Sequence, residues 1–429
     1  MDSAGQPGSI ERPARRARIG PTSIVGLVFL LALGALCFGS LFWTLGSGAI
    51  PWAVQSSGDP DAHRSTTPRY NAGDPKQARL PPFWVRPGQR TIRRLNGLVP
   101  EPQIRAITER FEQKEGEVLR STSGPVAEAV RRHWPRYPLG TDVLGRDVLI
   151  RSLTGGAISL GIGLAAALIS VCLGTLYGAI AGSVGGRIDA IMMRIVDVLY
   201  GLPYILLVVL LAVAADGLVD RLETARVSRA MAQRDAYAAR LAQTWARENG
   251  SSPPPEVQQR LDAEAIGRFG SGELSASNRM AIDVIVLLVA IGGVSWLTMA
   301  RVIRGQVLSL KARPFMEAAR AVGVPARRQF VGHLLPNLVG PIVVYATLTV
   351  PQAILQESFL SFLGIGVKPP LPSWGNMAAQ GLDELNPYES NWWLLLVPCV
   401  LLGSTLLALN FVGEALREAM DPKRTGPDR

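Results

Sequence analysis

Six long stretches without a charged side chain constrain this chain more than any other feature. The first lies between Arg18 and Asp59, and its part from residue 24 to 42 is almost entirely apolar. The other five cover residues 152–186, 198–215, 284–300, 334–356 and 390–413. A bilayer core about 30 Å thick requires roughly 20 apolar residues in a helix. Because strands could cross only as a closed barrel, for which no short alternating pattern is present, the sequence predicts an all-α integral membrane protein with six transmembrane helices.

The composition agrees with a membrane location. Only 18% of the 429 residues are charged, 48% are hydrophobic, and the mean hydropathy is +0.21. Soluble domains carry about 25% charged residues, so this deficit argues against a water-soluble enzyme. The net charge of +10 could indicate a nucleic-acid partner, but with such hydropathy it is better explained by membrane lipid and the cytoplasmic face of a membrane. We therefore expect no nucleic-acid partner.

The positions of the basic residues predict the orientation. An even number of spans puts both ends on one side. Four arginines precede the first span, and residues 301–333 carry seven basic residues against the single acid Glu317. By the positive-inside rule both segments are cytoplasmic, as expected in a cell inner membrane. The sequence thus predicts a cytoplasmic tail (1–23), a first transmembrane helix (24–46), an extracytoplasmic loop (47–150), a membrane domain (151–417) and a cytoplasmic tail (418–429).

Two hydrophilic segments lie on the predicted outer side. The loop 47–150 is rich in proline and charge and shows little apolar periodicity before about residue 103. The insertion 215–280 favours helix formers from residue 218 to 248 and, after a Pro-rich break, allows a shorter helix over 256–268. We expect a solvated helical hairpin in this insertion, with disorder as the alternative.

The basic loop between spans four and five, placed at residues 305–336, carries helix signals. Pro314 suits the first position of a short helix, and Gly323 suits the left-handed position just after its end. Pro325 can open a second short helix running toward Pro336. The paired alanines Ala318 and Ala319 leave a low surface against which another protein could pack. A two-turn helix is marginal alone, which indicates that it docks into a partner.

The same loop resembles a known motif. Glu317-Ala318-Ala319, then Gly323, then Leu335-Pro336, is similar to the EAA loop of importer-type ABC permeases. Further matches to the peptide and nickel branch of that family, and within it to the dipeptide and oligopeptide permeases, lie at residues 139–147, 193–203, 361–375 and 410–422. An ordered set of five motifs is far more specific than a lone Glu-Ala-Ala. The resemblance implies the type I ABC importer permease fold, although the loop 47–150 and the insertion 215–280 are longer than this family leads us to expect.

The resemblance also implies a division of labour. Two permeases would form the pathway, two ATPase subunits would bind their cytoplasmic loops, and an extracytoplasmic solute-binding protein would deliver the solute. In this chain Glu317 and Arg320 would make polar contacts, Ala318 and Ala319 would allow close approach, and Gly323 would form the turn. ATP and Mg²⁺ would be used by the partner ATPase. No lysine of this chain follows a glycine, so a phosphate-binding Walker A loop is not expected here, nor is a cofactor.

Four residues within or beside the spans are candidates for the translocation pathway. Arg194 and Asp197 stand three apart in the predicted third span, ahead of Pro203, and either line the pathway or neutralise each other near the interface. Glu357, at the outer end of the fifth span, either lines a vestibule or marks the interface. Trp374, Trp392 and Trp393 are predicted to form an aromatic belt. The scattered histidines and cysteines indicate no metal site.

Two other classes of protein compete with the permease. An ion-coupled secondary transporter usually has mid-membrane acids and repeated halves, whereas the spans here are nearly free of charge and no repeat is present. A membrane enzyme would need a polar cluster at an interface, for which Asp142, Arg146 and Asp147 are the only candidates. The sequence does not identify the transported molecule, which could be a dipeptide, an oligopeptide, nickel, glutathione or another solute.

Overall fold

The described part of the chain is built from helices. The computed structural model describes residues 21–48, 50–51, 67–385 and 390–420. Within these ranges the regular elements are helical, and pairing of extended backbone is limited to isolated bridges. The all-α prediction is confirmed, while most of the two predicted tails (residues 1–20 and 421–429) lies outside the described residues.

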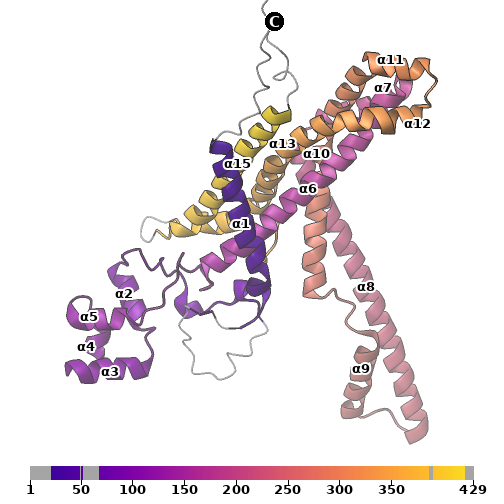
Figure 1. Cartoon of the computed structure of the whole chain (residues 1–429). Coiled ribbons are helices and arrows are strands. Elements are labelled where there is room, and N and C mark those ends of the chain that lie inside the picture. The colour runs from indigo at the N-terminus through magenta and orange to yellow at the C-terminus, as the bar shows by residue number, and fades with distance from the viewer. Residues whose placement is uncertain (1–20, 49, 52–66, 386–389, 421–429) are drawn as a thin grey trace, which may run out of the picture.

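Six apolar segments form the membrane bundle (Figure 1). Five are single helices long and apolar enough to cross a bilayer: α1 (Pro21–Leu45), α6 (Val148–Val184), α10 (Ala276–Lys311), α13 (Leu335–Phe362) and α15 (Trp393–Met420). The sixth is a broken pair, α7 (Gly186–Tyr200) and α8 (Tyr204–Asn249), whose axes bend by 91°. Five of the six predicted spans are thus single helices, and the broken pair makes a sixth if its two helices are counted as one span.

Helix α6 is the centre of the bundle because glycines on it admit its neighbours. Gly174, Gly178 and Gly182 recur every fourth residue, so they share one face of the helix. A Cβ atom on Gly178 would collide with the backbone of Ala300 in α10, and one on Gly182 would lie 2.8 Å from the Cβ of Val307. Small residues at this spacing let two helix backbones approach closely in a membrane.

The break between α7 and α8 corrects the prediction of one continuous third span over 198–215. Helix α7 ends at Tyr200, and Pro203 immediately precedes the first residue of α8. Proline disfavours helical backbone in the residue before it, here Leu202, so the chain cannot continue straight. As a result, Arg194 and Asp197 belong to α7 rather than to the segment that crosses the bundle.

Helix α8 continues far beyond the bundle and pairs with α9 (Pro255–Phe269). The two predicted helices of the insertion are thus present, but the first of them is the unbroken continuation of the third span. Arg279 binds Asp220 (2.6 Å) and Glu223 (2.7 Å) at the base of this hairpin, and Lys368 binds Asp216 (2.7 Å). These ion pairs hold the hairpin to the bundle at the point where α8 leaves it.

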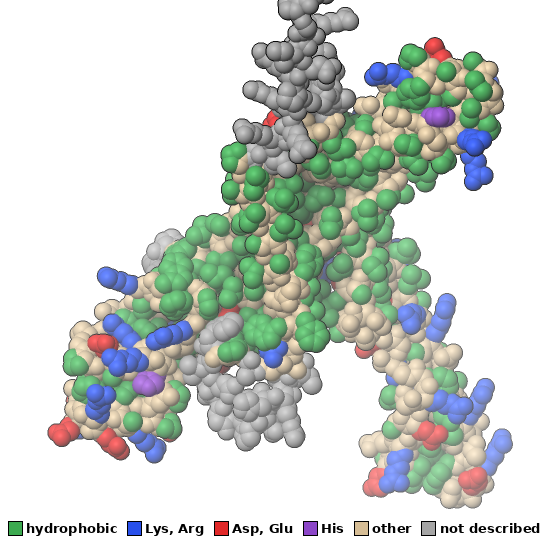
Figure 2. All heavy atoms as spheres, viewed as in Figure 1, with side chains coloured by type: hydrophobic (Ala, Val, Ile, Leu, Met, Phe, Trp, Pro, Cys, Tyr) green, Lys and Arg blue, Asp and Glu red, His purple; other side chains and the backbone are tan. Residues whose placement is uncertain are grey.

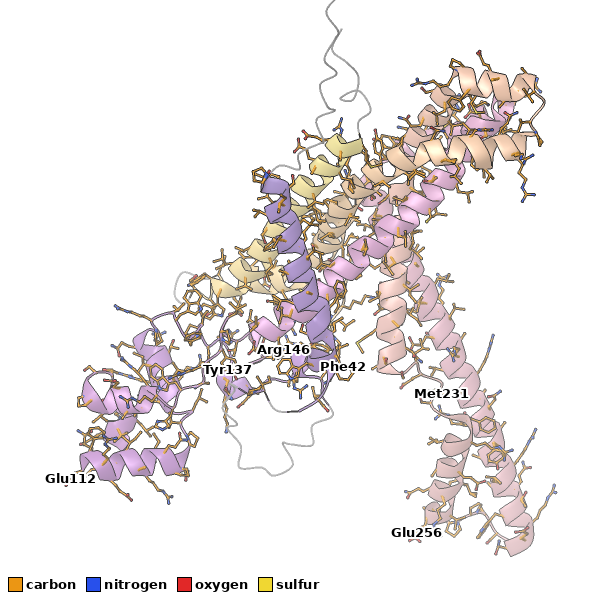
Figure 3. All side chains as sticks on the ribbon, viewed as in Figure 1. Phe42, Glu112, Tyr137, Arg146, Met231 and Glu256 are labelled. Carbon is orange, nitrogen blue, oxygen red and sulfur yellow. The ribbon has the colours of Figure 1, made fainter. Side chains whose placement is uncertain are left out.

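The second hydrophilic segment forms an outer lobe, defined here as residues 67–147. It contains α2 (Gln89–Asn96), α3 (Glu101–Phe111), α4 (Glu115–Arg120) and α5 (Gly124–Arg131). Val118 and Val130 are fully buried in a core shared with Ile104 and Trp134. The sequence shows little apolar periodicity before residue 103, yet helix α2 lies there. A helix of eight residues is too short to produce a clear periodic pattern. Tyr137 and Arg146 lie where the lobe joins the bundle (Figure 3).

The two hydrophilic segments share one side of the molecule. Figure 1 shows the outer lobe and the α8–α9 hairpin at one end of the bundle, with Glu256 at the tip of the hairpin in Figure 3. The start of α1, the end of α15 and the loop between α10 and α13 lie toward the opposite end. Between the charged ends, Figure 2 shows a surface dominated by hydrophobic side chains. This is the charge distribution that a bilayer requires.

Candidate functional site

The loop between spans four and five contains a short helix, α11 (Pro314–Ala321), whose ends follow from its sequence. Pro314 occupies the first turn, where its missing N–H costs nothing. After the helix, Gly323 adopts φ +78° and donates its backbone N–H to the carbonyl of Arg320 (2.9 Å). Glycine is favoured there because left-handed backbone strains residues with a Cβ. The helix and the glycine turn are present where the sequence predicts them.

One face of α11 packs onto the bundle. Met316 is only 1% exposed and lies in a buried cluster with Ile303 and Val307 of α10 and Leu338 of α13. Burying a methionine stabilises a packed helix by about 1.5–3 kcal/mol. Ala319, one turn further on, is buried on the same face. The two alanines therefore differ, since Ala319 is buried within this chain and Ala318 is exposed.

A neighbouring face of α11 is open and partly apolar. Phe315, Ala318 and Val322 follow one helix face at a spacing of three and four residues, and Val322 is 83% exposed. Glu317 and Arg320 lie elsewhere on the helix and are also exposed, with Arg320 donating to the carbonyl of Lys311 (3.3 Å). An exposed apolar patch on a helix that also carries exposed charges is typical of a protein–protein contact.

Cationic side chains connect this loop to the bundle. The Lys311 ammonium donates to the carbonyls of Gly182 (3.1 Å) and Ser183 (2.9 Å), which are free acceptors at the C-terminal end of α6. Arg304 of α10 forms two hydrogen bonds to Asp189 of α7, of 2.5 and 2.7 Å. A bidentate guanidinium–carboxylate pair fixes orientation as well as distance. Displacing α11 and the end of α10 would therefore move α6 and α7 as well.

The second half of the loop differs from the prediction. Pro325 caps the short helix α12 (Ala326–Gln329), but the chain then passes through one π-turn, Phe330–Leu334, directly into α13. The predicted second helix does not end at Pro336, because the wider π-turn lets the chain pass the proline without a break. Leu335 and Pro336 are exposed in the first turn of α13.

Of the two roles considered for Arg194 and Asp197, the structure does not support their mutual ion pair. Asp197 instead accepts from Arg301 of α10 (2.9 Å), whose guanidinium also lies 4.0 Å from the ring centre of Tyr200. Arg194 is exposed and has no ion-pair partner among the described residues. The spacing of Arg194 and Asp197 places both on one face of a helix. The partner of Asp197 nevertheless comes from α10, more than 100 residues later in the sequence.

Both readings of Glu357 are also wrong, since its side chain is fully buried rather than facing a vestibule or the interface. It accepts hydrogen bonds from Ser361 (2.7 Å) and Ser358 (3.2 Å) on its own helix. Ser159 of α6 and Ser373, the residue before α14 (Trp374–Asp383), also bond to this carboxyl group. Four hydroxyls satisfy the buried acid and tie three helices together, which is a structural role. Trp374 is likewise fully buried and so does not belong to an aromatic belt.

A neutral polar cavity lies at the break between α7 and α8, and sequence reasoning missed it. Its volume is about 370 Å³, and its lining comes from four helices: Leu199, Tyr200, Leu202, Tyr204, Val294, Leu297, Thr298, Gln352 and Gln356. The Tyr204 hydroxyl bonds to Ser295 (2.7 Å) and to Gln356 (2.7 Å). Single uncharged polar residues in apolar spans carry little sequence signal, so only their convergence at the cavity reveals them.

The polar residues considered for a membrane enzyme have structural roles. Asp142 pairs with Arg146 (2.7 Å) and accepts backbone N–H bonds from Leu144 and Arg146. Asp147 caps the first turn of α6 by accepting from Leu149 and Ile150. These contacts use the carboxylates to shape the start of α6. Among the described residues, no group of three or more His, Cys, Asp or Glu is placed to hold a metal ion.

Comparison with known proteins agrees with this architecture. Residues 174–426 match the family described as "Binding-protein-dependent transport system inner membrane component". The chain is 39% identical over 284 residues to the oligopeptide transport system permease protein OppC of Escherichia coli, covering 66% of this chain and 72% of the relative. It is 37% identical over 291 residues to the dipeptide transport system permease protein DppC of Bacillus subtilis, covering 68% and 69%. These matches favour a permease over the ion-coupled carrier and the membrane enzyme. The chain belongs to the family of inner membrane components of binding-protein-dependent transport systems, and it is a multi-pass permease subunit rather than an enzyme.

Proposed function

We propose that this chain forms half of the translocation pathway of an ATP-binding-cassette importer for peptide-like solutes and that α11 is its contact with a separate ATPase. The observation that carries the proposal is the two-sided packing of α11, with Met316 buried in the bundle and Phe315, Ala318 and Val322 exposed. The peptide substrate rests on the names of the OppC and DppC relatives. A second permease subunit, two ATPase subunits and an extracytoplasmic solute-binding protein complete the proposed assembly.

In this proposal the ATPase moves the spans through rigid contacts. ATP and Mg²⁺ act in the partner subunits, and this chain supplies no cofactor. When the ATPase subunits close, α11 is displaced, and Lys311 and Arg304 transmit that displacement to α6 and α7. The bend before α8 lets α7 move without dragging the outer hairpin. Short docked helices of this kind can pass a small shift into a two-state packing change.

The coupling role is tested with Glu317→Lys and Gly323→Asp. Glu317 is exposed, so its charge reversal leaves the bundle intact, whereas Gly323→Asp forces a Cβ into left-handed backbone at the end of α11. We expect ATP-driven peptide uptake by reconstituted proteoliposomes to be abolished, with unchanged membrane insertion and with weakened co-purification of the ATPase.

Glu256→Lys is the matched control, because Glu256 is also an exposed first-turn glutamate but lies on the outer hairpin. It should transport normally. Normal uptake by either coupling variant would refute the assignment of α11.

We further propose that the cavity at Tyr204 forms this subunit's part of the pathway wall. Neutral hydroxyl and amide groups can bond to the amides of a peptide without selecting a side-chain charge. They replace Arg194, Asp197 and Glu357 as pathway candidates, since neither Arg194 nor Asp197 lines the cavity and Glu357 is buried among serines. Pro203 remains part of the proposal, because it creates the break at which the cavity opens.

Tyr204→Phe and Gln356→Leu test this wall. Each removes a hydrogen-bonding group worth about 0.5–1.5 kcal/mol, so we expect uptake of peptides at limiting concentration to fall roughly 2- to 10-fold. Co-purification of the ATPase should stay at the wild-type level. Tyr345→Phe in α13 is the control, because Tyr345 packs in the separate cluster around Met316. Uptake unchanged in both cavity variants would contradict the proposal.

A further inference from the structure

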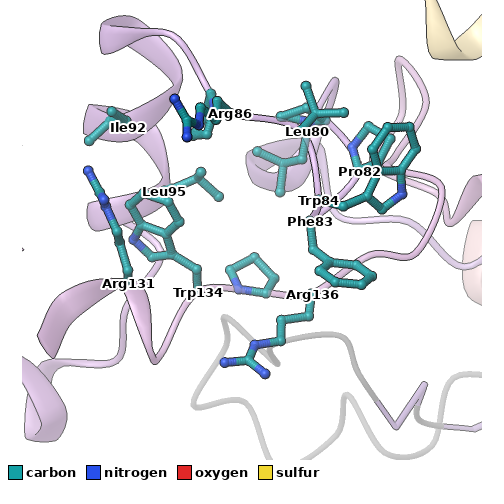
Figure 4. A pocket seen from close by; sticks show the side chains of 14 residues that line it. Leu80, Pro82, Phe83, Trp84, Arg86, Ile92, Leu95, Arg131, Trp134 and Arg136 are labelled. Atoms are coloured by element: carbon teal, nitrogen blue, oxygen red, sulfur yellow. The ribbon is translucent and has the colours of Figure 1, made fainter. Parts of the chain in front are cut away.

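The outer lobe carries two adjoining hollows with a strongly basic lining. The first, of about 660 Å³, lies between the segment 80–87, helix α2 and the segment 131–136 (Figure 4). The second, of about 520 Å³, lies between α2 and the start of α15. They share Pro81, Val85, Arg86 and Pro87 as a common wall. Most of the lining, between residues 79 and 136, precedes residue 174, where the matched family segment begins, so that match assigns this lining no role.

The charges of the lining are all of one sign. Arg86, Arg131 and Arg136 line the first hollow, and neither hollow is lined by an Asp or Glu of the described residues. Arg86 and Arg136 are exposed, and no ion pair with a described carboxylate involves either of them. Arg79 and Arg94 line the second hollow as well, but the Arg79 guanidinium is already paired with the Glu384 carboxylate (2.6 Å). Exposed guanidinium groups such as those of Arg86 and Arg136 attract anions, and a bound anion offsets their charge.

The second hollow lies at the level where the last span begins. Its lining includes Trp392 and Trp393, and Trp393 is the first residue of α15. Trp84 lies 6.1 Å from Trp392, ring centre to ring centre, and is 58% exposed, while its neighbour Phe83 is 61% exposed. Tryptophans at the end of a span and exposed aromatic loops are typical of the headgroup region of a bilayer.

From this geometry we propose that the lobe binds the phosphate group of an anionic phospholipid in the outer leaflet. Arg86, on the wall between the hollows, and Arg136 supply positive charge and paired N–H donors. A guanidinium group can bind a phosphate through two parallel hydrogen bonds. Phe83 and Trp84 lie among the glycerol and upper acyl groups of the same lipid. A basic pocket beside a span is a known way to hold anionic headgroups. The proposal requires that α15 crosses the membrane and that the lobe lies on its outer side.

Position distinguishes this occupant from the two alternatives. The cavity proposed for the transported peptide lies between α7, α8, α10 and α13, and none of its lining residues belongs to the lobe. In Figure 1 the lobe lies at the end of α6 that is far from α7. A water-soluble binding protein would meet the lobe from the aqueous side, whereas the second hollow lies beside the start of α15, the last candidate span. The arginine excess of the outer loop, 17 basic against 11 acidic residues over 47–151, then has a use on the non-cytoplasmic side.

The experiment measures lipid retention rather than transport. The importer complex is purified from nanodiscs that contain phosphatidylcholine with phosphatidylglycerol, and the lipids retained by this chain are counted by native mass spectrometry. We expect wild-type protein to retain phosphatidylglycerol in preference to phosphatidylcholine. The double variant Arg86→Ala/Arg136→Ala should lose that preference roughly tenfold, as the loss of charged hydrogen bonds implies.

A matched double variant controls for net charge. Arg105→Ala/Arg132→Ala removes two arginines from the same lobe, at exposed positions where they pair with Glu101 and Glu128 away from the hollows. It should retain phosphatidylglycerol normally. Equal retention of the two lipids by wild type, or unchanged preference in Arg86→Ala/Arg136→Ala, would overturn the proposal.

Two further arms identify the source of the bound anion. Inorganic phosphate at matched ionic strength should fail to displace the lipid, and displacement by free phosphate would show that the lipid is not the specific ligand. The double variant Phe83→Ser/Trp84→Ser should weaken lipid retention. If the arginine variant loses the extracytoplasmic binding protein while its lipid preference is unchanged, the site is a protein contact and the lipid proposal fails. Because none of these readouts requires uptake, they stay separate from the test of α11.

Discussion

Among single residues, Arg79 and Glu384 show how the outer lobe is held to the membrane domain. The Arg79 guanidinium donates two hydrogen bonds to the Glu384 carboxylate, of 2.6 and 2.8 Å, across 305 residues of sequence. These bonds, together with one from Asn391, lower the pKa of Glu384 below its ordinary value, against a smaller opposing effect of burial. The pair therefore links the stability of the lobe junction to pH.

The pH prediction follows from the direction of that shift. A carboxylate whose pKa is lower in the folded than in the unfolded state stabilises the folded state at pH values above its unfolded pKa, about 4.3 for glutamate. This stabilisation is lost as the pH falls through the folded-state pKa. We expect the segment before α15 to become more accessible to protease or hydrogen exchange as the pH is lowered through this range. Glu384→Gln should show a flatter pH dependence, and a wild-type response identical to that of the variant would contradict the role of the pair.

At the scale of elements, the contact of α6 with α10 decides the architecture of the bundle. The glycine face of α6 brings the two helix backbones together, and Arg304 and Lys311 then bind α10 to α7 and to the end of α6. Because α11 sits directly after α10, the precision of this contact also positions the proposed coupling helix. Overpacking at this interface should therefore affect stability first.

Gly178→Leu is the sharpest test of that contact. The added side chain collides with the backbone of Ala300, which cannot move aside as a flexible side chain could. We expect a loss of about 1–3 kcal/mol or more, read as a lower thermal midpoint and lower yield in detergent. Gly403→Leu in α15 is the control, because no atom lies within 4 Å of a Cβ at that position. Equal stability of the two variants would contradict close packing at Gly178.

At the scale of the whole molecule, charge and shape give the same orientation. The basic loop with α11 lies at one end and the outer lobe and hairpin at the other, with an apolar surface between them (Figures 1 and 2). The positive-inside rule favours the α11 end as cytoplasmic. In that orientation the start of α1 and the end of α15 face the cytoplasm, and the lobe and hairpin face the compartment from which solute arrives.

Single cysteines test this orientation. In a chain whose three cysteines, Cys37, Cys172 and Cys399, are replaced, Ser251→Cys places a thiol at the tip of the hairpin and Val322→Cys places one beside α11. A membrane-impermeant maleimide should label Ser251→Cys in intact spheroplasts, and Val322→Cys only after permeabilisation. The reverse labelling pattern would show that the chain is inserted the other way.

The sequence by itself determined features that depend on neighbours along the chain. Charge-free stretches predicted the six spans, and Pro314 and Gly323 predicted the ends of α11, because bilayer thickness and backbone conformation act locally. The ordered motifs indicated the permease family, which the comparisons confirm.

Only the tertiary structure decided which side chains meet. It paired Asp197 with Arg301 instead of Arg194, and it surrounded Glu357 with serines from α6, α13 and the start of α14. It also made Ala318 exposed and Ala319 buried, because the face that α11 presents to the bundle depends on where α10 and α13 lie. Such contacts join helices far apart in sequence, and spacing along one helix cannot specify the partner that packing brings to it.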